Sequence, residues 1–312
     1  KGIIKKDDAT GKITSKSYFA SYKDNKWGVI DSLGNVVIDP SYQEMIVIPN
    51  NKSGVFICTY NINYETGEYK TKVLNQKNEE ILTDYDKVEA IQNIDENNNL
   101  WYEQSVIKVM KNGLYGLVDL SGKEIIPINY EEIVPVLKIE NSFKIKKDGK
   151  YGIVDADGKT VVQPKYNEID ILGKDNKSGF IVKDETGKYG IIDYSNNVIL
   201  QNQYDSIQKV FGNDLYVVTV KGKQKIVNKD NTDVLTKGFD SIEQILSSQE
   251  NAVIYKKDNK YGIMSLTGEK LVDAQYDYLK EAKTGMFIAQ SGNLFGIISI
   301  NRDGMLSFEY SS

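Results

Sequence analysis

Histidine is absent from this sequence of 312 residues, and cysteine occurs once, at Cys58. Without histidine, Ser-His-Asp and Cys-His catalysis are excluded, and so are the common zinc sites. A single cysteine also excludes an intrachain disulfide and a thiolate cluster. Cys58 lies in the apolar run 55–59, which predicts a buried, unreactive thiol rather than a nucleophile.

Arginine and long apolar runs are scarce as well. Arg302 is the only arginine among 39 basic residues, and the formal net charge is −5. Because arginine is the preferred residue for bidentate contacts with phosphates and bases, we expect no nucleic-acid partner. No stretch approaches the roughly 18 apolar residues of a membrane span, so no transmembrane segment is expected. Apolar residues still make up 40% of the chain, which is enough for a folded core.

What the sequence does contain is an internal repeat, marked by an aromatic residue followed by an anchor glycine. Six copies carry this pair, and two more copies have Lys72 and Lys225 at the glycine position. The six pairs are Trp27 and Gly28, Tyr115 and Gly116, Tyr151 and Gly152, Tyr189 and Gly190, Tyr261 and Gly262, and Phe295 and Gly296. Successive anchors lie 44, 44, 36, 38, 35, 37 and 34 residues apart, so eight copies cover nearly the whole chain. Periods of this length are typical of solenoids, arrays and propellers.

The remaining positions of the repeat are strand and turn positions. Two apolar residues follow every anchor, and glycine or asparagine stands six residues after it in seven of the eight copies. Short β-branched runs between turn residues predict strands, and no run has a sustained helical period. Pairs such as Asp148 and Gly149 before the anchor strand predict tight hairpin turns. Each copy should therefore contain three strands, with a tyrosine–acid segment as a possible fourth.

This pattern resembles the WG-repeat family of bacterial proteins. The best matches are 26–34, which reads Lys-Trp-Gly-Val-Ile-Asp-Ser-Leu-Gly, and 150–158, which reads Lys-Tyr-Gly-Ile-Val-Asp-Ala-Asp-Gly. The resemblance covers essentially the full length. It implies an all-β repeat that serves in binding or scaffolding, and it implies no enzymatic activity.

We expect residues 1–312 to form a single array of about eight such repeats, with irregular lead-in strands in 1–22. Two architectures remain open. The first is an open, solenoid-like array. The unequal copy lengths favour it, because copies in an open array do not have to close into a ring. The second is a closed β-propeller with about one four-stranded blade per repeat.

Two repeated patterns have both a chemical and a structural interpretation. The turn that begins at Asp155 could bind calcium, but asparagine or serine takes its place in other copies, which favours a hydrogen-bonded turn. Tyrosine–acid pairs such as Tyr204 and Asp205 could line a sugar-binding groove. Their fixed place in the repeat favours a corner, in which the ring packs between units and the acid caps a turn. We therefore expect no metal site, no cofactor and no catalytic residue.

The sequence thus predicts a non-catalytic binding or scaffolding module of the cell surface or the secreted fraction. The expected partner is a protein or a cell-wall or host glycan. The extracellular or cell-envelope location rests on the many tyrosines and asparagines, the lack of a metabolic motif, and a first residue, Lys1, that is not methionine. A hydrolase based on carboxylates and tyrosines and a passive structural stalk remain alternatives.

The first two intervals are longer than the others because two insertion loops, 61–70 and 93–103, lie in them. Insertions in repeat proteins map to loops on one face, often the binding face. Their aromatic residues, Tyr64, Tyr69, Trp101 and Tyr102, are the candidate ligand-binding residues, because exposed loop aromatics are common recognition anchors. Alternatively, Trp101 folds back onto the array.

Overall fold

The protein is all-β, as the sequence predicts. A computed structural model describes residues 16–172, 179–211, 215–245, 252–300 and 310–311, and it divides the chain into two compact units, 1–176 and 177–312. Among the described residues, no helix is long and apolar enough to cross a membrane. Of the predicted lead-in 1–22, residues 1–15 lie outside the described part, and the rest enters a regular strand that begins at Tyr18.

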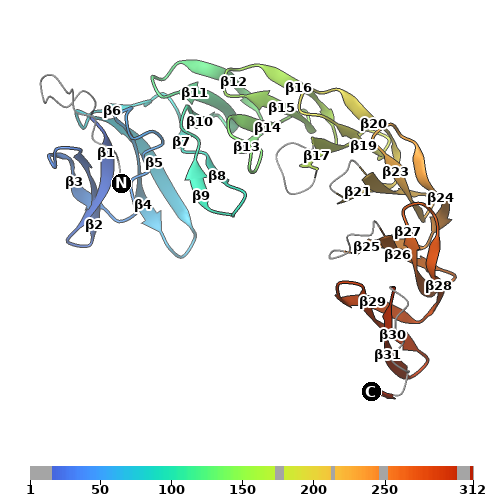
Figure 1. Cartoon of the computed structure of the whole chain (residues 1–312). Coiled ribbons are helices and arrows are strands. Elements are labelled where there is room, and N and C mark those ends of the chain that lie inside the picture. The colour runs from blue at the N-terminus through green and yellow to red at the C-terminus, as the bar shows by residue number, and fades with distance from the viewer. Residues whose placement is uncertain (1–15, 173–178, 212–214, 246–251, 301–309, 312) are drawn as a thin grey trace, which may run out of the picture. The chain divides into compact units, whose positions relative to one another are not determined.

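Unit 1 contains the sheets of the first four copies and the strand β17, and its strands lie at the blue-to-green end of the chain (Figure 1). The strands of unit 1 are β1 (Tyr18–Lys23), β2 (Lys26–Asp31), β3 (Val36–Tyr42), β4 (Val55–Asn63), β5 (Glu68–Asn75), β6 (Glu80–Ile81), β7 (Lys87–Glu89), β8 (Gln92–Ile94), β9 (Leu100–Tyr102), β10 (Val106–Lys111), β11 (Leu114–Asp119), β12 (Glu124–Tyr130), β13 (Glu132–Pro135), β14 (Ser142–Lys147), β15 (Lys150–Asp155), β16 (Thr160–Tyr166) and β17 (Glu168–Ile171).

Unit 2 repeats the same pattern of lead strand, anchor strand and closing strand. Its strands are β18 (Phe180–Lys183), β19 (Tyr189–Ile192), β20 (Val198–Tyr204), β21 (Ser206–Phe211), β22 (Leu215–Val220), β23 (Lys223–Asn228), β24 (Asp233–Phe239), β25 (Ser241–Gln244), β26 (Ala252–Lys257), β27 (Lys260–Ser265), β28 (Lys270–Tyr276), β29 (Tyr278–Lys283), β30 (Met286–Ser291), β31 (Leu294–Ser299) and β32 (Tyr310–Ser311). The predicted lead and anchor strands are thereby confirmed.

Each copy forms one small antiparallel sheet, and these sheets are open. In unit 1 the strand orders are β1-β2-β3, β4-β5-β6, β7-β10-β11-β12 and β13-β14-β15-β16, with β8-β9 as a separate hairpin. In unit 2, β21 to β24, β25 to β28 and β29 to β32 form four-stranded sheets. The strand after the tyrosine–acid pair joins the next sheet, so this pair marks the boundary between consecutive sheets.

The hydrophobic core lies between neighbouring sheets within each unit. In unit 1, for example, Leu117 of the third copy packs with Phe143 and Ile145 of the fourth, and all three are buried. In unit 2, Val217 of the sixth copy packs with Val253 of the seventh. A single sheet cannot bury its own apolar face, so each copy is stabilised by the next one.

The anchor glycine is required because the closing strand bulges over it. In the fourth copy Tyr151 pairs with Tyr166 and Ile153 with Val162, so the closing strand has extra residues opposite Gly152. A Cβ atom on Gly152 would lie 2.5 Å from the carbonyl oxygen of Val162. No side chain fits at that distance, which explains the glycine of the repeat.

The aromatic ring before the glycine is half-buried and packs at the edge of the core, as Trp27, Tyr115 and Tyr261 do in their copies. Tyr151 lies at the border of the core, and its ring faces two lysines, with Lys144 Nζ at 5.2 Å and Lys146 Nζ at 5.4 Å from the ring centroid. The ring therefore contributes a cation–π contact in addition to its partial burial.

The corner and the hydrogen-bonded turn, both expected from the repeat, are confirmed. At one corner Tyr276 is buried, Asp277 Oδ2 accepts a hydrogen bond from the amide of Gly292 at 2.8 Å, and Lys260 pairs with the same carboxylate. In the turn of the fourth copy, Asp155 Oδ1 accepts hydrogen bonds from the amides of residues 157 and 159 at 3.0 and 2.8 Å. The repeated carboxylates are thus engaged in backbone turns.

Candidate functional site

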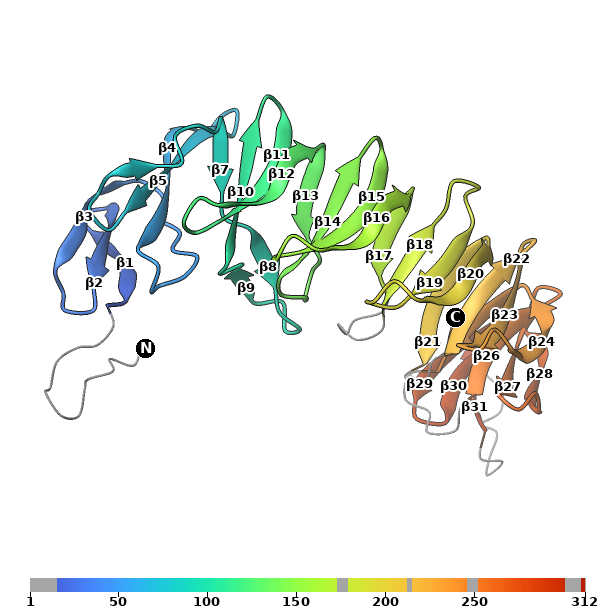
Figure 2. The same ribbon diagram turned by 90° about the horizontal axis from the view of Figure 1, so that it is seen from above.

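Both insertions form β-hairpins rather than irregular loops. Residues 61–70 extend the hairpin of β4 and β5, whose tip is the turn around Gly67. Within 93–103, β8 and β9 form a second hairpin that leaves the sheet of β7, β10, β11 and β12 (Figure 1, Figure 2). Tyr69, Trp101 and Tyr102 lie in strands, which hold side chains at fixed spacing, and Tyr64 lies in the turn between β4 and β5.

In the second copy, most of the segment that precedes β4 is unpaired beside the hairpin of β4 and β5. In a regular copy the first strand pairs with the lead strand over several residues, as β13 does with β14. In the second copy this pairing is reduced to one bridge, between Val47 and Ile57, with hydrogen bonds of 3.0 and 2.9 Å. Beyond the bridge, the chain that precedes Val47 is not paired with β4. A pocket lies at this point.

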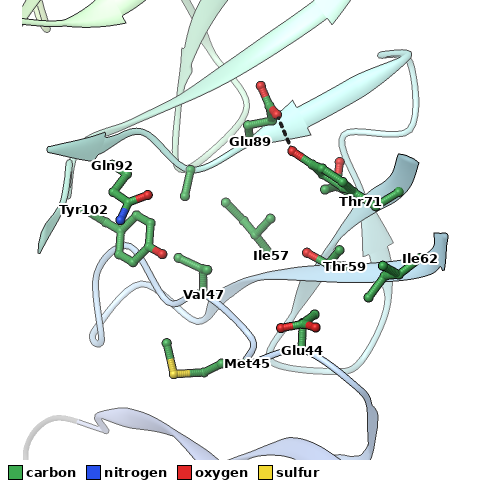
Figure 3. A pocket seen from close by; sticks show the side chains of 12 residues that line it. Glu44, Met45, Val47, Ile57, Thr59, Ile62, Thr71, Glu89, Gln92 and Tyr102 are labelled. Atoms are coloured by element: carbon green, nitrogen blue, oxygen red, sulfur yellow. Dashed lines mark hydrogen bonds between the residues drawn. The ribbon is translucent and has the colours of Figure 1, made fainter. Parts of the chain in front are cut away.

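The pocket has a volume of about 520 Å³ and lies entirely within unit 1; we call it the insertion pocket (Figure 3). It is bounded by the segment before β4, by β4 and β5, by the end of β7, and by β8 and β9. The lining residues are Glu44, Met45, Val47, Ile57, Thr59, Ile62, Tyr69, Thr71, Glu89, Ala90, Gln92 and Tyr102. Each insertion contributes to it, so the pocket depends on the two departures from the repeat.

The middle of the insertion pocket is aliphatic and its margins are acidic. Figure 3 shows Val47 and Ile57 in the middle, with Glu44 and Glu89 on opposite sides of them. Tyr102 lies at one end of the pocket. The arrangement combines an apolar surface with a few polar groups, as is common in binding sites.

Both carboxylate oxygens of Glu89 already have partners within the protein. Its Oε1 lies 2.6 Å from Lys87 Nζ and accepts a hydrogen bond from Tyr69 Oη at 3.1 Å, and its Oε2 lies 3.1 Å from Lys108 Nζ. Burial by itself raises the pKa of Glu89, but the hydrogen bond from Lys87 and the charge of Lys108 bring that pKa below its ordinary value. Glu89 is therefore ionised and fixes the ring of Tyr69.

Glu44 has a different environment. Its Oε1 accepts one hydrogen bond, from Tyr64 Oη at 3.1 Å, and the side chain is exposed. Within the described part of the chain, Glu44 forms no ion pair. Its negative charge is therefore available to a ligand, whereas that of Glu89 is compensated by two lysines.

A buried polar network holds the hairpin that carries Tyr102. The side chains of Asn93 and Glu103 are 1% and 0% exposed. Asn93 Nδ2 donates to Glu103 Oε1 at 3.1 Å, and the amide of Asn141 donates to Glu103 Oε2 at 3.0 Å. Burial raises the pKa of Glu103. The network joins the insertion to the loop after β13 and so fixes one wall of the pocket.

The structure brings three of the four predicted aromatic residues together. Tyr69 and Tyr102 line the insertion pocket, and Tyr64 holds Glu44 through its hydroxyl. Trp101 does not line the pocket. It is the neighbour of Tyr102 in β9, so it faces the other side of the hairpin, where it is partly buried.

Sequence reasoning missed the residues that precede β4 and follow β7, above all Glu44, Met45 and Gln92. They occupy irregular positions of the repeat and carry no motif. The available signal was the unusual second copy itself, in which Lys72 replaces the anchor glycine.

A second pocket, of about 600 Å³, lies in unit 2 between the closing strand β24 and the sheet of β26 to β28. Phe239, Tyr255 and Met264 line it, and all of them also belong to the core cluster between the sixth and seventh copies. It contains no inserted residue, so it is a space between two sheets. Among the described residues, no group of three or more Cys, Asp or Glu side chains is placed to hold a metal ion.

Comparison with known proteins identifies the repeat. Residues 27–57, 115–151, 151–180 and 189–223 match the family model described as WG containing repeat. No curated protein matches the chain in sequence. Two of these four segments adjoin at Tyr151, and the matched copies are the first, third, fourth and fifth.

Several solved structures are weakly similar. Hsv2 of Kluyveromyces marxianus is 10% identical over 53% of this chain and 57% of its own, with a TM-score of 0.34. The WD40 domain of Neurospora crassa Pan2 is 10% identical over 70% of this chain and 78% of its own, with a TM-score of 0.28. Apo AztD from Citrobacter koseri is 13% identical over 94% of both chains, with a TM-score of 0.32. At these values the likenesses carry no argument about function.

Proposed function

Because the chain is a WG-repeat protein, we propose that it is a non-catalytic binding module whose partner docks at the insertion pocket. One observation carries this proposal: the two insertions, which are the largest departures from the repeat, build a single pocket. Tyr69 comes from the first insertion and Tyr102 from the second. Residues that serve only the array have no need to converge in this way.

Exposure supports binding over a passive stalk. Met45 and Tyr69 in the pocket lining are 47% and 43% exposed, and Tyr64, which donates a hydrogen bond to Glu44, is 68% exposed. Clustered exposed apolar and aromatic side chains are a frequent mark of an interaction site, because they offer contact area that is released from water on binding. A stalk would be expected to distribute such residues singly along its length.

The pocket chemistry also argues against a hydrolase. Glycoside hydrolysis needs one carboxylic acid whose pKa is raised so that it can donate a proton. In the insertion pocket the pKa of Glu89 is lowered instead, and its oxygens are occupied by Lys87, Lys108 and Tyr69. Glu103 has a raised pKa, but it is fully buried and does not line the pocket. We therefore propose that the protein is not an enzyme.

The proposed partner is a protein or a cell-wall or host glycan, and the proposed location is extracellular or in the cell envelope. The single thiol is compatible with this location. Cys58 is completely buried, and burial raises its pKa to about 11, so the thiolate that oxidation requires is scarce at neutral pH.

The test is a binding screen of the whole chain against glycans and against envelope and host proteins, followed by a double variant, Tyr69→Ala with Tyr102→Ala. We expect affinity for the partner to fall while the unfolding midpoint stays close to that of the parent. Tyr278→Ala is the matched control, because Tyr278 is 40% exposed but lies in unit 2. A partner that binds the double variant as tightly as the parent would place the binding site elsewhere.

A further inference from the structure

The aliphatic part of the insertion pocket limits the kind of ligand that fits it. Val47, Ile57, Ile62 and Ala90 present no polar atom in their side chains. A sugar ring placed over them would leave hydroxyl groups without hydrogen-bond partners, which costs free energy. An apolar side chain placed there would lose only its contact with water, which is favourable.

The acidic margin adds a second requirement. Glu44 is exposed and lies at the pocket with a single hydrogen bond, from Tyr64. That bond orients the carboxylate but does not neutralise it. A cationic group next to Glu44 would form a charge-assisted hydrogen bond, and the nearby tyrosine rings would add attraction to the cation.

We propose that the insertion pocket binds a polypeptide segment that places a large apolar side chain over Val47 and Ile57 and a lysine or arginine against Glu44. This inference rests on the proposed binding function and names the class of partner for the same pocket. Glu89 at the opposite margin is already paired with Lys87 and Lys108, so the cation binds on the side of Glu44.

Polar groups on the same walls fit a polypeptide backbone. Gln92 lies in the lining, with an amide that can donate and accept hydrogen bonds, and Thr59 contributes a hydroxyl group. They can pair with the peptide groups on either side of the apolar residue. The pocket therefore offers matched contacts for the backbone, the apolar side chain and the charge of one short segment.

The experiment uses a phage-displayed library of random dodecapeptides selected on the whole chain. We expect the selected peptides to carry a large apolar residue next to lysine or arginine. One synthetic peptide from the selection is then titrated against the parent and against Glu44→Lys. The variant should weaken binding on the order of tenfold or more, as the loss of one charge-assisted contact predicts. Added salt should weaken binding to the parent.

Two further variants make the result interpretable. Glu65→Lys changes an exposed acid on the same hairpin that does not line the pocket, and it should leave the affinity nearly unchanged. Met45→Ser removes an exposed apolar wall and should weaken binding without altering the charge. Circular dichroism melts confirm that each variant folds like the parent.

The outcomes separate this inference from the proposed function. Peptides without a basic residue, or equal affinity for Glu44→Lys and the parent, would overturn the inference. Binding of a glycan that is lost with Tyr69→Ala and Tyr102→Ala, together with a selection that yields no peptide, would also overturn it while leaving the binding function intact. Failure of both peptides and glycans to bind at this pocket would refute both.

Discussion

The fourth and second copies are built from the same repeat, yet one forms a complete sheet and the other forms a pocket. In the fourth copy Gly152 lies under the bulge, and the closing strand β16 continues to Tyr166. In the second copy Lys72 stands at the glycine position, and the closing strand β6 has only two residues. The first strand of that copy is reduced to a single bridge.

The side chain of Lys72 contacts two tyrosine rings near the anchor position. Its Nζ lies 5.7 Å from the ring centroid of Tyr42 and 5.3 Å from that of Tyr60. A lysine at the anchor position is therefore tolerated where the closing strand stops early. In regular copies the backbone groups of the first strand pair with the lead strand. In the second copy part of the edge of the lead strand β4 borders the insertion pocket instead.

The sixth copy sharpens this comparison, because it also has lysine at the anchor. Its closing strand β24 is complete and keeps the bulge, with Gln224 paired to Phe239 and Ile226 to Leu235. Gly238 lies in this bulge, where a Cβ atom would lie 3.0 Å from Cβ of Lys223. Lysine at the anchor therefore does not by itself shorten the closing strand, which has seven residues in β24 and two in β6.

The largest expected effect is that of Gly152→Ala in the fourth copy. The new Cβ would lie within 2.9 Å of three backbone atoms of β16, so the bulge must move. We expect the free energy of unfolding to fall by about 3 kcal/mol, as for a severe overpacking change. Urea denaturation of the whole chain measures it.

Lys72→Gly is the matched change in the second copy. The closing strand has no bulge over this position, so the cost should be only about 1 kcal/mol, from the greater chain entropy of glycine in a strand and the loss of the lysine's contacts with Tyr42 and Tyr60. Equal losses for the two variants would show that the anchor glycine has no steric role.

The sequence predicted the regular part of this molecule well, because repetition averages out local ambiguity. Eight aligned copies located the lead strands, the hairpin turns and the corners, and positive φ at Asn112 and Asp148 confirms the turn chemistry. The half-burial of Tyr151 was not predictable, because a fixed place in a repeat does not reveal which side of a sheet is covered.

The candidate site was predictable only in part. Insertion lengths led to Tyr69 and Tyr102, because inserted residues stand out against a repeat. Glu44 and Glu89 could not be found this way, because their roles depend on which sheets approach each other. Asn93 and Glu103 looked like ordinary polar insertion residues, and only the structure shows them buried. Long-range contacts in irregular copies leave no periodic signal.

An effect of intermediate size is expected in native-state hydrogen exchange. The second copy lacks the aromatic–glycine pair and most of a closing strand, so the amides of Val73 and Leu74 should open more easily than those of Ile153 and Val154, by about 2 kcal/mol. Residues 226–227 of the sixth copy should lie between these two, because that copy lacks the pair but keeps its closing strand. Equal protection in all three copies would contradict this order.

The smallest effect concerns acid and the corners between sheets. A hydrogen bond from Lys260 lowers the pKa of Asp277. A carboxyl group with a lowered pKa stabilises the fold at every pH above its unfolded value, near 4, and loses this contribution as the pH falls through the folded pKa.

At the corner after the fourth copy, Asn167 occupies the position that Asp277 has here. Its amide oxygen Oδ1 accepts a hydrogen bond from Lys150 at 2.6 Å. Asp277→Asn should therefore lower the unfolding midpoint slightly at pH 7 and hardly at all at pH 2. Asn167→Asp should introduce the opposite dependence, with a slight gain at pH 7 that disappears in acid. Thermal unfolding of the parent and both variants at the two pH values measures the difference, and parallel pH profiles for all three proteins would show that the corner carboxylates do not contribute to stability.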